Sequence, residues 1–157
     1  MLIIADSSAL VALALCDGLN LLDRLFDNVQ VPQAVYDEVI VKDKPAAQAL
    51  KEYLQGKVIP VSLANVVITG GGLGRGEIEA MALYKAVHAD YLLIDDNRAR
   101  KVAKLNHITI TGSQGILLLA KHRGIIPHVK PYLDQLRNTN IRFSERLLQR
   151  TLALAKE

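Results

Sequence analysis

The chain is poor in cysteine and in aromatic residues. Its 157 residues include one cysteine and no tryptophan, and aromatic residues make up only 4% of the total. A single cysteine, Cys16, excludes a disulfide within the chain, and this is typical of a protein from a reducing compartment such as the cytoplasm. Because 50% of the residues are hydrophobic, the core must consist mainly of aliphatic side chains, as in α/β proteins with aliphatic sheets.

Long hydrophobic runs are also missing. No apolar segment reaches the ~20 residues that a membrane-spanning helix needs. The apolar N-terminus is interrupted at Asp6 and lacks the preceding basic residues of a signal peptide, so we expect no membrane association. The histidines lack the spacing of a zinc site; they are His88, His107, His122 and His128.

Charge is nearly balanced, with a formal net charge of +3. This small basic excess is compatible with a nucleic-acid partner but does not require one. The length of the chain suits one domain with one core. We expect a single domain over residues 1–157, with a core over about 1–125 and C-terminal helices over about 128–157.

Apolar runs of strand length alternate with segments of helical periodicity. Five runs are predicted to be strands: 2–5, 29–31, 58–61, 91–94 and 108–110. The complete order is β-α-α-β-α-α-β-α-β-α-β-α-α-α. This alternation predicts an α/β fold, a three-layer α/β/α sandwich with a mainly parallel central sheet and a C-terminal helical extension.

Three helix starts are marked by local signals. Pro32 is expected in the first turn of a helix, where its missing N–H costs nothing. The helix after the glycine-rich segment 70–76 is expected to begin at about Glu77. Ser144 is expected to cap the last helix.

Acidic residues recur at the predicted ends of strands and starts of helices. They are Asp6, Glu38, Glu77, Glu79, Asp95 and Asp96. Ligands of parallel sheets bind beyond the carboxyl ends of the strands, where the fold would bring these carboxylates together. Their mutual repulsion calls for a hard cation such as Mg²⁺. A magnesium site of this kind predicts metal-assisted phosphodiester chemistry.

Each acid alone also has a simpler explanation. Asp6 and the Asp95–Asp96 pair can cap the helices that follow them. Glu77 or Glu79 can be a first-turn acid that the helix dipole favours. Glu38 can be a solvated helix residue. Only the recurrence of acids at corresponding ends of the fold favours a shared site.

Other phosphate-chemistry motifs do not fit the sequence. Glycines 71 and 76 have P-loop spacing, but Glu77 stands where the P-loop needs a lysine. The segment is also consistent with a flexible loop beside the site. A receiver-type phosphoacceptor would need a lysine near the end of a late strand, and the chain has none there. A haloacid-type phosphatase would need a second aspartate at the position of Ser8.

Four segments, taken in order, resemble the PIN-domain nucleases. They are Ala5–Leu10 (ADSSAL), Val31–Val39 (VPQAVYDEV), Gly76–Leu83 (GEIEAMAL) and Leu93–Arg100 (LIDDNRAR). The resemblance covers roughly residues 1–125. The segment Thr111–Leu117 (TGSQGIL) and the helical tail are similar to a prokaryotic branch near the VapC-type toxins.

This resemblance implies an acidic pocket that binds Mg²⁺ or Mn²⁺ and cleaves RNA. Asp6, Glu38, Glu77 and Asp96 match the acidic quartet of the family, which makes them the catalytic and metal-binding candidates. Asp95 competes with Asp96 as a metal ligand, and Glu79 competes with Glu77. Ser8 matches a small hydroxyl residue that often supports the first acid.

The predicted function is therefore a metal-dependent endoribonuclease, and the toxin relatives imply an antitoxin partner. The alternative is a catalytically silent RNA- or partner-binding module on the same fold. Candidates for contacts with RNA phosphates are Arg75, Arg98, Arg100, Lys101 and Lys104. Surplus leucines in the C-terminal helices predict a homodimer, unless they pack onto the chain's own core; they are Leu147, Leu148, Leu152 and Leu154.

Overall fold

The computed structural model describes residues 1–64 and 66–157. Within those residues, five strands alternate with nine helices in the predicted order. The strands are β1 (Leu2–Ala5), β2 (Asn28–Pro32), β3 (Val58–Ile59), β4 (Tyr91–Leu93) and β5 (Ile110–Thr111). The helices are α1 (Ser7–Leu15), α2 (Leu19–Leu25), α3 (Gln33–Val39), α4 (Ala47–Tyr53), α5 (Arg75–Val87), α6 (Asn97–Leu105), α7 (Ser113–His122), α8 (Lys130–Arg137) and α9 (Glu145–Leu154).

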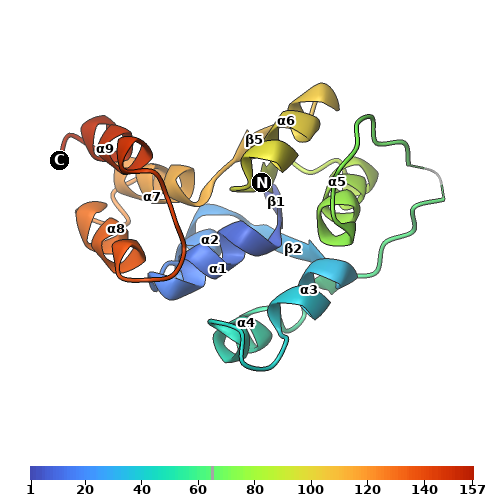
Figure 1. Cartoon of the computed structure of the whole chain (residues 1–157), viewed down its shortest axis with the longest axis horizontal. Helices are drawn as coiled ribbons and strands as arrows, with labels where there is room; N and C mark the ends of the chain where they lie inside the picture. The colour runs from blue at the N-terminus through green and yellow to red at the C-terminus, as the bar shows by residue number, and fades with distance from the viewer. Residues whose placement is uncertain (65) are drawn as a thin grey trace.

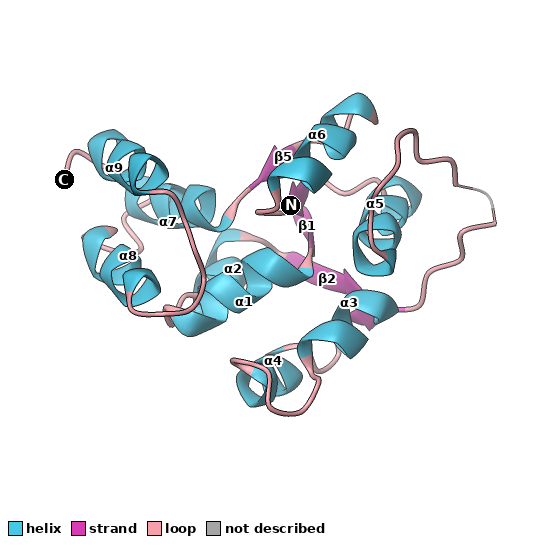
Figure 2. Ribbon diagram, viewed as in Figure 1, coloured by secondary structure: helices cyan, strands magenta, loops and turns pink. Residues whose placement is uncertain are grey.

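The strands form one parallel sheet in the order β3-β2-β1-β4-β5. The chain starts in the middle, moves to one edge through β2 and β3, and then crosses to β4 and β5. Because such crossovers are right-handed, the change of direction places the connecting helices on opposite faces. In Figure 1, α1, α2 and α4 lie on one side of the sheet and α5 and α6 on the other. Figure 2 shows the short strands between these helix layers. The predicted α/β sandwich is confirmed.

The central strand β1 is an aliphatic segment that is buried on both faces. Ile3, Ile4 and Ala5 are fully buried, because helices cover both sides of the sheet. Burial of one isoleucine side chain contributes roughly 1.5–3 kcal/mol. Pairing of β1 with both β2 and β4 fixes where β1 ends, and Asp6 is the first residue beyond it.

Two predicted helix starts shift by one or two residues. Pro32 is the last residue of β2 and has extended backbone angles, with φ −74° and ψ 159°, so α3 begins at Gln33. The expectation that Pro32 lies in the first turn was wrong, because the strand continues up to this residue. The helix expected at Glu77 begins at Arg75, which puts Glu77 in its first turn. Ser144 caps α9 as predicted.

The leucines of α9 divide between the core and the surface. Leu148 and Leu152 are buried, whereas Leu147 is 41% exposed and Leu154 is 63% exposed. Half of this set therefore packs onto the chain's own core. Among the described helices, none combines the length and the apolar character that a membrane crossing requires.

Glu157, just beyond α9, ties the C-terminal helices together. Its carboxylate accepts hydrogen bonds from Lys121 Nζ at 2.8 Å and from the backbone N–H groups of Val129 at 2.8 Å and Lys130 at 3.1 Å. Burial opposes ionisation of this carboxyl, but the three donors outweigh it together and lower its pKa from 4.5 to about 2. The ionised carboxylate therefore stabilises the packing of α9 against α7 and α8.

Replacing Glu157 with Gln should lower the melting temperature at neutral pH. Because the folded-state pKa lies below the unfolded one, the stabilisation is present above pH 4.5 and is lost as the pH falls towards about 2. The difference in melting temperature between wild type and Glu157→Gln should therefore shrink with acidification. Glu145→Gln on the exposed start of α9 is the control, and equal effects of the two variants at neutral pH would contradict the expectation.

Candidate active site

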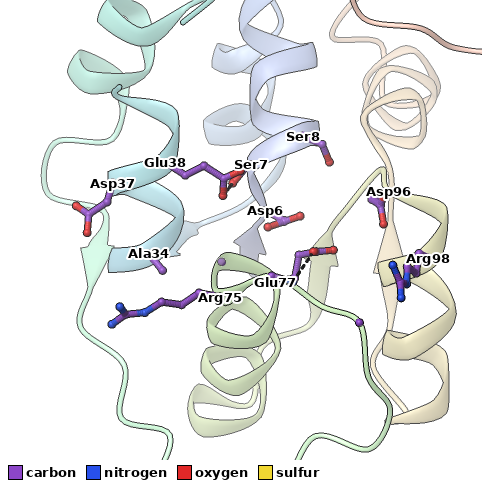
Figure 3. A pocket seen from close by; sticks show the side chains of 13 residues that line it. Asp6, Ser7, Ser8, Ala34, Asp37, Glu38, Arg75, Glu77, Asp96 and Arg98 are labelled. Carbon is purple, nitrogen blue, oxygen red and sulfur yellow. Dashed lines mark hydrogen bonds between the residues drawn. The ribbon is translucent and has the colours of Figure 1, made fainter. Parts of the chain in front are cut away.

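The candidate site is a cavity of about 680 Å³ at the carboxyl edge of the sheet. Asp6 follows β1, Asp96 follows β4, Glu38 lies in α3 and Glu77 lies in the first turn of α5. All four side chains line the cavity, and Figure 3 shows Asp6 and Glu77 between the Glu38 and Asp96 sides of it. The fold thus brings together four acids that are far apart in the sequence.

Asp6 is the most buried acid of the cavity, with 3% of its surface exposed. Its backbone N–H donates to the Leu93 carbonyl at 2.9 Å, which extends the pairing of β1 with β4 to this residue. Although Asp6 is at the N-cap position of α1, its side chain makes no capping hydrogen bond. Its Oδ1 atom has no hydrogen-bond partner among the described residues, so helix capping does not explain this carboxylate.

The surroundings of Asp6 make its charged form costly. Burial is the main cause and raises the pKa of Asp6 from 3.8 to about 7, although the backbone hydrogen bond with Ser7 opposes the shift. The nearby charges of Glu77, Glu38 and Asp96 add to the increase. A buried carboxylate surrounded by three others is the arrangement expected of a site that binds a cation.

Glu38 is held by a hydroxyl group and is closely approached by a glycine. The Ser7 hydroxyl donates to Glu38 Oε2 at 2.8 Å. A Cβ atom on Gly76 would lie 3.0 Å from the same oxygen. The absence of a side chain at position 76 therefore leaves room for the Glu38 carboxylate.

Replacing Gly76 with Ala should displace Glu38 and reduce activity by roughly 10- to 100-fold, the range seen when support of a metal ligand is removed. Alanine stabilises a helix by about 1 kcal/mol relative to glycine. This gain offsets the cost of displacing the Glu38 side chain, so the free energy of unfolding should change little. Cleavage rate and melting temperature measured together test this. Gly71→Ala is the matched control, because a Cβ atom there would meet nothing within 4 Å. Equal rates for the two variants would show that the Gly76 contact is unimportant.

The structure separates Glu77 from its competitor Glu79. Glu77 lines the cavity and accepts a hydrogen bond from the Gly74 N–H at 3.0 Å. Glu79 is only 4% exposed and does not line the cavity; it accepts from the Ala34 N–H at 3.2 Å and from Arg75 Nε at 2.9 Å. Glu79 therefore links the start of α3 to α5 and does not contact the cavity.

Asp95 and Asp96 point in different directions as well. Asp96 lines the cavity, and its Oδ2 atom caps α6 by accepting from the Ala99 N–H at 2.9 Å. Asp95 accepts from both the backbone N–H and the hydroxyl of Ser113, each at 2.7 Å. Burial raises the pKa of Asp95, while the bonds from Ser113 and the charge of Arg100 oppose the shift. Asp95 thus fixes the start of α7 beside the site.

The predicted hydroxyl and basic residues also differ in whether they line the cavity. Ser8 lines the cavity, but it is Ser7 that bonds to Glu38, and no sequence signal distinguished the two serines. Arg75 and Arg98 line the cavity. Arg100 is turned inward and donates to the Ile94 carbonyl at 2.8 Å. The other two basic candidates, Lys101 and Lys104, lie exposed on α6 and do not line this cavity.

The donor set of the cavity suits a hard divalent cation, since all four candidate ligands are carboxylates. Over residues 1–64 and 66–157, no three acidic, histidine or cysteine side chains are grouped tightly enough to hold a metal ion on their own. Mg²⁺ usually keeps several waters and uses one or two carboxylates, so it does not need such a group. The free Oδ1 atom of Asp6 and the surrounding negative charge therefore fit an ion that is held partly through water.

The chain is thus a parallel α/β sandwich with four acids that converge at the carboxyl edge of its sheet. The family model described as PIN domain matches residues 2–157, and the chain belongs to this family. No curated protein and no solved structure matches the chain with significant similarity. PIN domains are generally nucleases that use divalent metals, and the resemblance noted in the sequence is confirmed at the level of the family.

Proposed function

We propose that the protein is a metal-dependent endoribonuclease whose site consists of Asp6, Glu38, Glu77 and Asp96. The observation that carries this proposal is the buried Asp6 carboxylate: one of its oxygens has no partner among the described residues, and its pKa is raised by burial and by three neighbouring acids. A structural carboxylate would instead have hydrogen-bond partners. The proposed metal is Mg²⁺ or Mn²⁺.

Each residue of the site has a role in this mechanism. Asp6 and Asp96 would hold the ion, which would lower the pKa of a water molecule and neutralise charge on the phosphate. Glu38, fixed by Ser7, and Glu77 would accept hydrogen bonds from the attacking water and orient it. The two arginines at the rim, Arg75 and Arg98, would bind phosphate groups of the RNA backbone.

The alternative is a module on the same fold that binds RNA or a partner without cutting RNA. A toxin role with an antitoxin partner is the more specific form of the main proposal. Homodimerisation is a competing use of the exposed Leu147 and Leu154 side chains.

The deciding experiment is cleavage of a mixed pool of single-stranded and structured RNA. The protein is incubated with Mn²⁺, with Mg²⁺, or with EDTA, and the products are separated by size. Cleavage in either metal that EDTA abolishes is the expected result. Binding of RNA by the folded protein without cleavage in either metal would favour the silent module and contradict the nuclease proposal.

A further inference from the structure

A second cavity, of about 740 Å³, lies next to the acidic one. It is bordered by the ends of β4 and β5, by α7, and by α9 with the segment that precedes it. Ser8 and Asp96 line both cavities, so the two are adjacent. In Figure 1, α7 and α9 lie together on the side of the molecule opposite α5. We call this second cavity the α9 cleft.

Two arginines of the α9 cleft pair with no described acid. Arg142 and Arg150 line it, are exposed, and form no hydrogen bond or ion pair with the described side chains. Arg137, by contrast, lies outside the cleft and pairs with two acids. Of the acids that line the cleft, Asp95 is bound to Ser113 and Asp96 lies at the border with the acidic cavity. Unpaired guanidinium groups in such a place match phosphate oxygens.

The wall of the cleft also contains a buried amide with an unmet hydrogen bond. Gln114 is 6% exposed and lines the cleft. The Thr151 hydroxyl contacts both the Gln114 amide and the Leu147 carbonyl, but it has only one proton to donate. Whichever way the amide is turned, one of its two polar atoms has no partner among the described residues. Such a buried atom costs about 1–3 kcal/mol.

We propose that the α9 cleft binds the single-stranded RNA segment on one side of the scissile phosphate. Arg142 and Arg150 contact its backbone phosphates, and the Phe143 ring at the wall of the cleft packs against a base. This inference rests on the proposed ribonuclease function, because an RNA cut in the acidic cavity must leave it along a neighbouring surface. It assigns a substrate-positioning role to the C-terminal segment.

Single-stranded RNA fits this cleft better than the other two occupants that its chemistry allows. A second copy of the chain or an apolar peptide would cover Leu147 and Leu154, which also line the cleft. Either would bury two unpaired arginines beside them, at a cost of several kcal/mol per uncompensated charge. RNA supplies both phosphates for the arginines and base faces for the apolar wall.

The test compares arginines on the same helix and in the segment before it. Arg142→Ala and Arg150→Ala remove charge from the cleft, whereas Arg146→Ala removes the same charge from an exposed position of α9 outside it. Binding of a fluorescent single-stranded RNA is measured by anisotropy over a range of salt concentrations. An Asp6→Asn background keeps the RNA uncut. In the cutting-competent protein, KM and kcat are measured separately.

The expected result is a rise in Kd of about tenfold for each cleft variant and little change for Arg146→Ala. The slope of log K against log salt should fall by about 0.7 for each cleft arginine. KM should rise while kcat stays close to that of the wild type.

Each other outcome separates this inference from the proposed function. If the wild type cleaves RNA but the three arginine variants bind it equally, the inference is overturned and the nuclease proposal stands. If the wild type does not cleave RNA and only the cleft variants lose RNA binding, the cleft is an RNA-binding site of a protein that does not cut RNA. The nuclease proposal then fails and the inference about the cleft holds. Unchanged RNA binding together with a changed mass in solution would assign the cleft to self-association and overturn the inference.

Discussion

Replacing Asp6 with Asn should reduce RNA cleavage in Mn²⁺ by at least about 100-fold. A bound metal supplies several kcal/mol of charge stabilisation in the transition state, and each 1.36 kcal/mol corresponds to about a tenfold change in rate. Asn keeps the size of the side chain but lacks the negative charge that holds the ion. Initial rates on a defined RNA substrate, at saturating metal, are the measurement.

Asp37→Asn is the matched control for this variant. Asp37 also lines the acidic cavity, but its carboxylate bonds to Gln33 at 2.8 Å, and Figure 3 shows its side chain directed away from Asp6. This variant should keep most of the activity. If Asp6→Asn cut RNA as fast as Asp37→Asn, Asp6 could not be a ligand of the catalytic metal.

The same Asp6 substitution should stabilise the metal-free protein at alkaline pH. Because the folded-state pKa of Asp6 is raised from 3.8 to about 7, its contribution to stability is complete below pH 3.8 and is lost as the pH rises through about 7. Between about pH 5 and pH 8 the loss for this one group is about 2–3 kcal/mol. Asp6→Asn has no such ionisation and should lack this part of the pH dependence.

Chemical denaturation in EDTA at the two pH values measures this difference directly. Addition of Mn²⁺ at the higher pH should restore stability to the wild type, since the ion binds only the folded state, and should have little effect on Asp6→Asn. Parallel pH profiles for the two proteins in EDTA would contradict the assignment of the raised pKa to Asp6. They would place the pH dependence elsewhere in the acidic cavity.

The order of the elements was predictable because burial imposes a simple pattern on this chain. A parallel sheet covered on both faces needs short aliphatic runs such as Leu2–Ala5 and Tyr91–Leu93, and these contrast clearly with the helical segments around them. The same reasoning predicted that acids gather at the carboxyl edge of the sheet. The choice of Asp6, Glu38, Glu77 and Asp96, which line one cavity, came from the resemblance to the PIN-domain nucleases. Their roles in catalysis stay a prediction.

The choice between neighbouring acids could not be made from the sequence. Glu77 and Glu79 are two residues apart in one helix, and only the contact of Glu79 with Ala34, 45 residues away, shows that Glu79 is engaged outside the cavity. Asp95 and Asp96 both follow a strand, but only long-range contact with Ser113, 18 residues away, shows that Asp95 is engaged elsewhere. Side-chain direction in these places depends on tertiary contacts, which local patterns do not encode.

The central position of β1 also affects when the site can form during synthesis. The first strand of the chain pairs with β4, which ends at Leu93, and Asp96 follows it. A growing chain that has emerged only as far as α5 therefore has neither the second neighbour of β1 nor the fourth acid. If the protein has the proposed ribonuclease function, a chain still on the ribosome therefore cannot complete its site until more than half of the sequence has emerged.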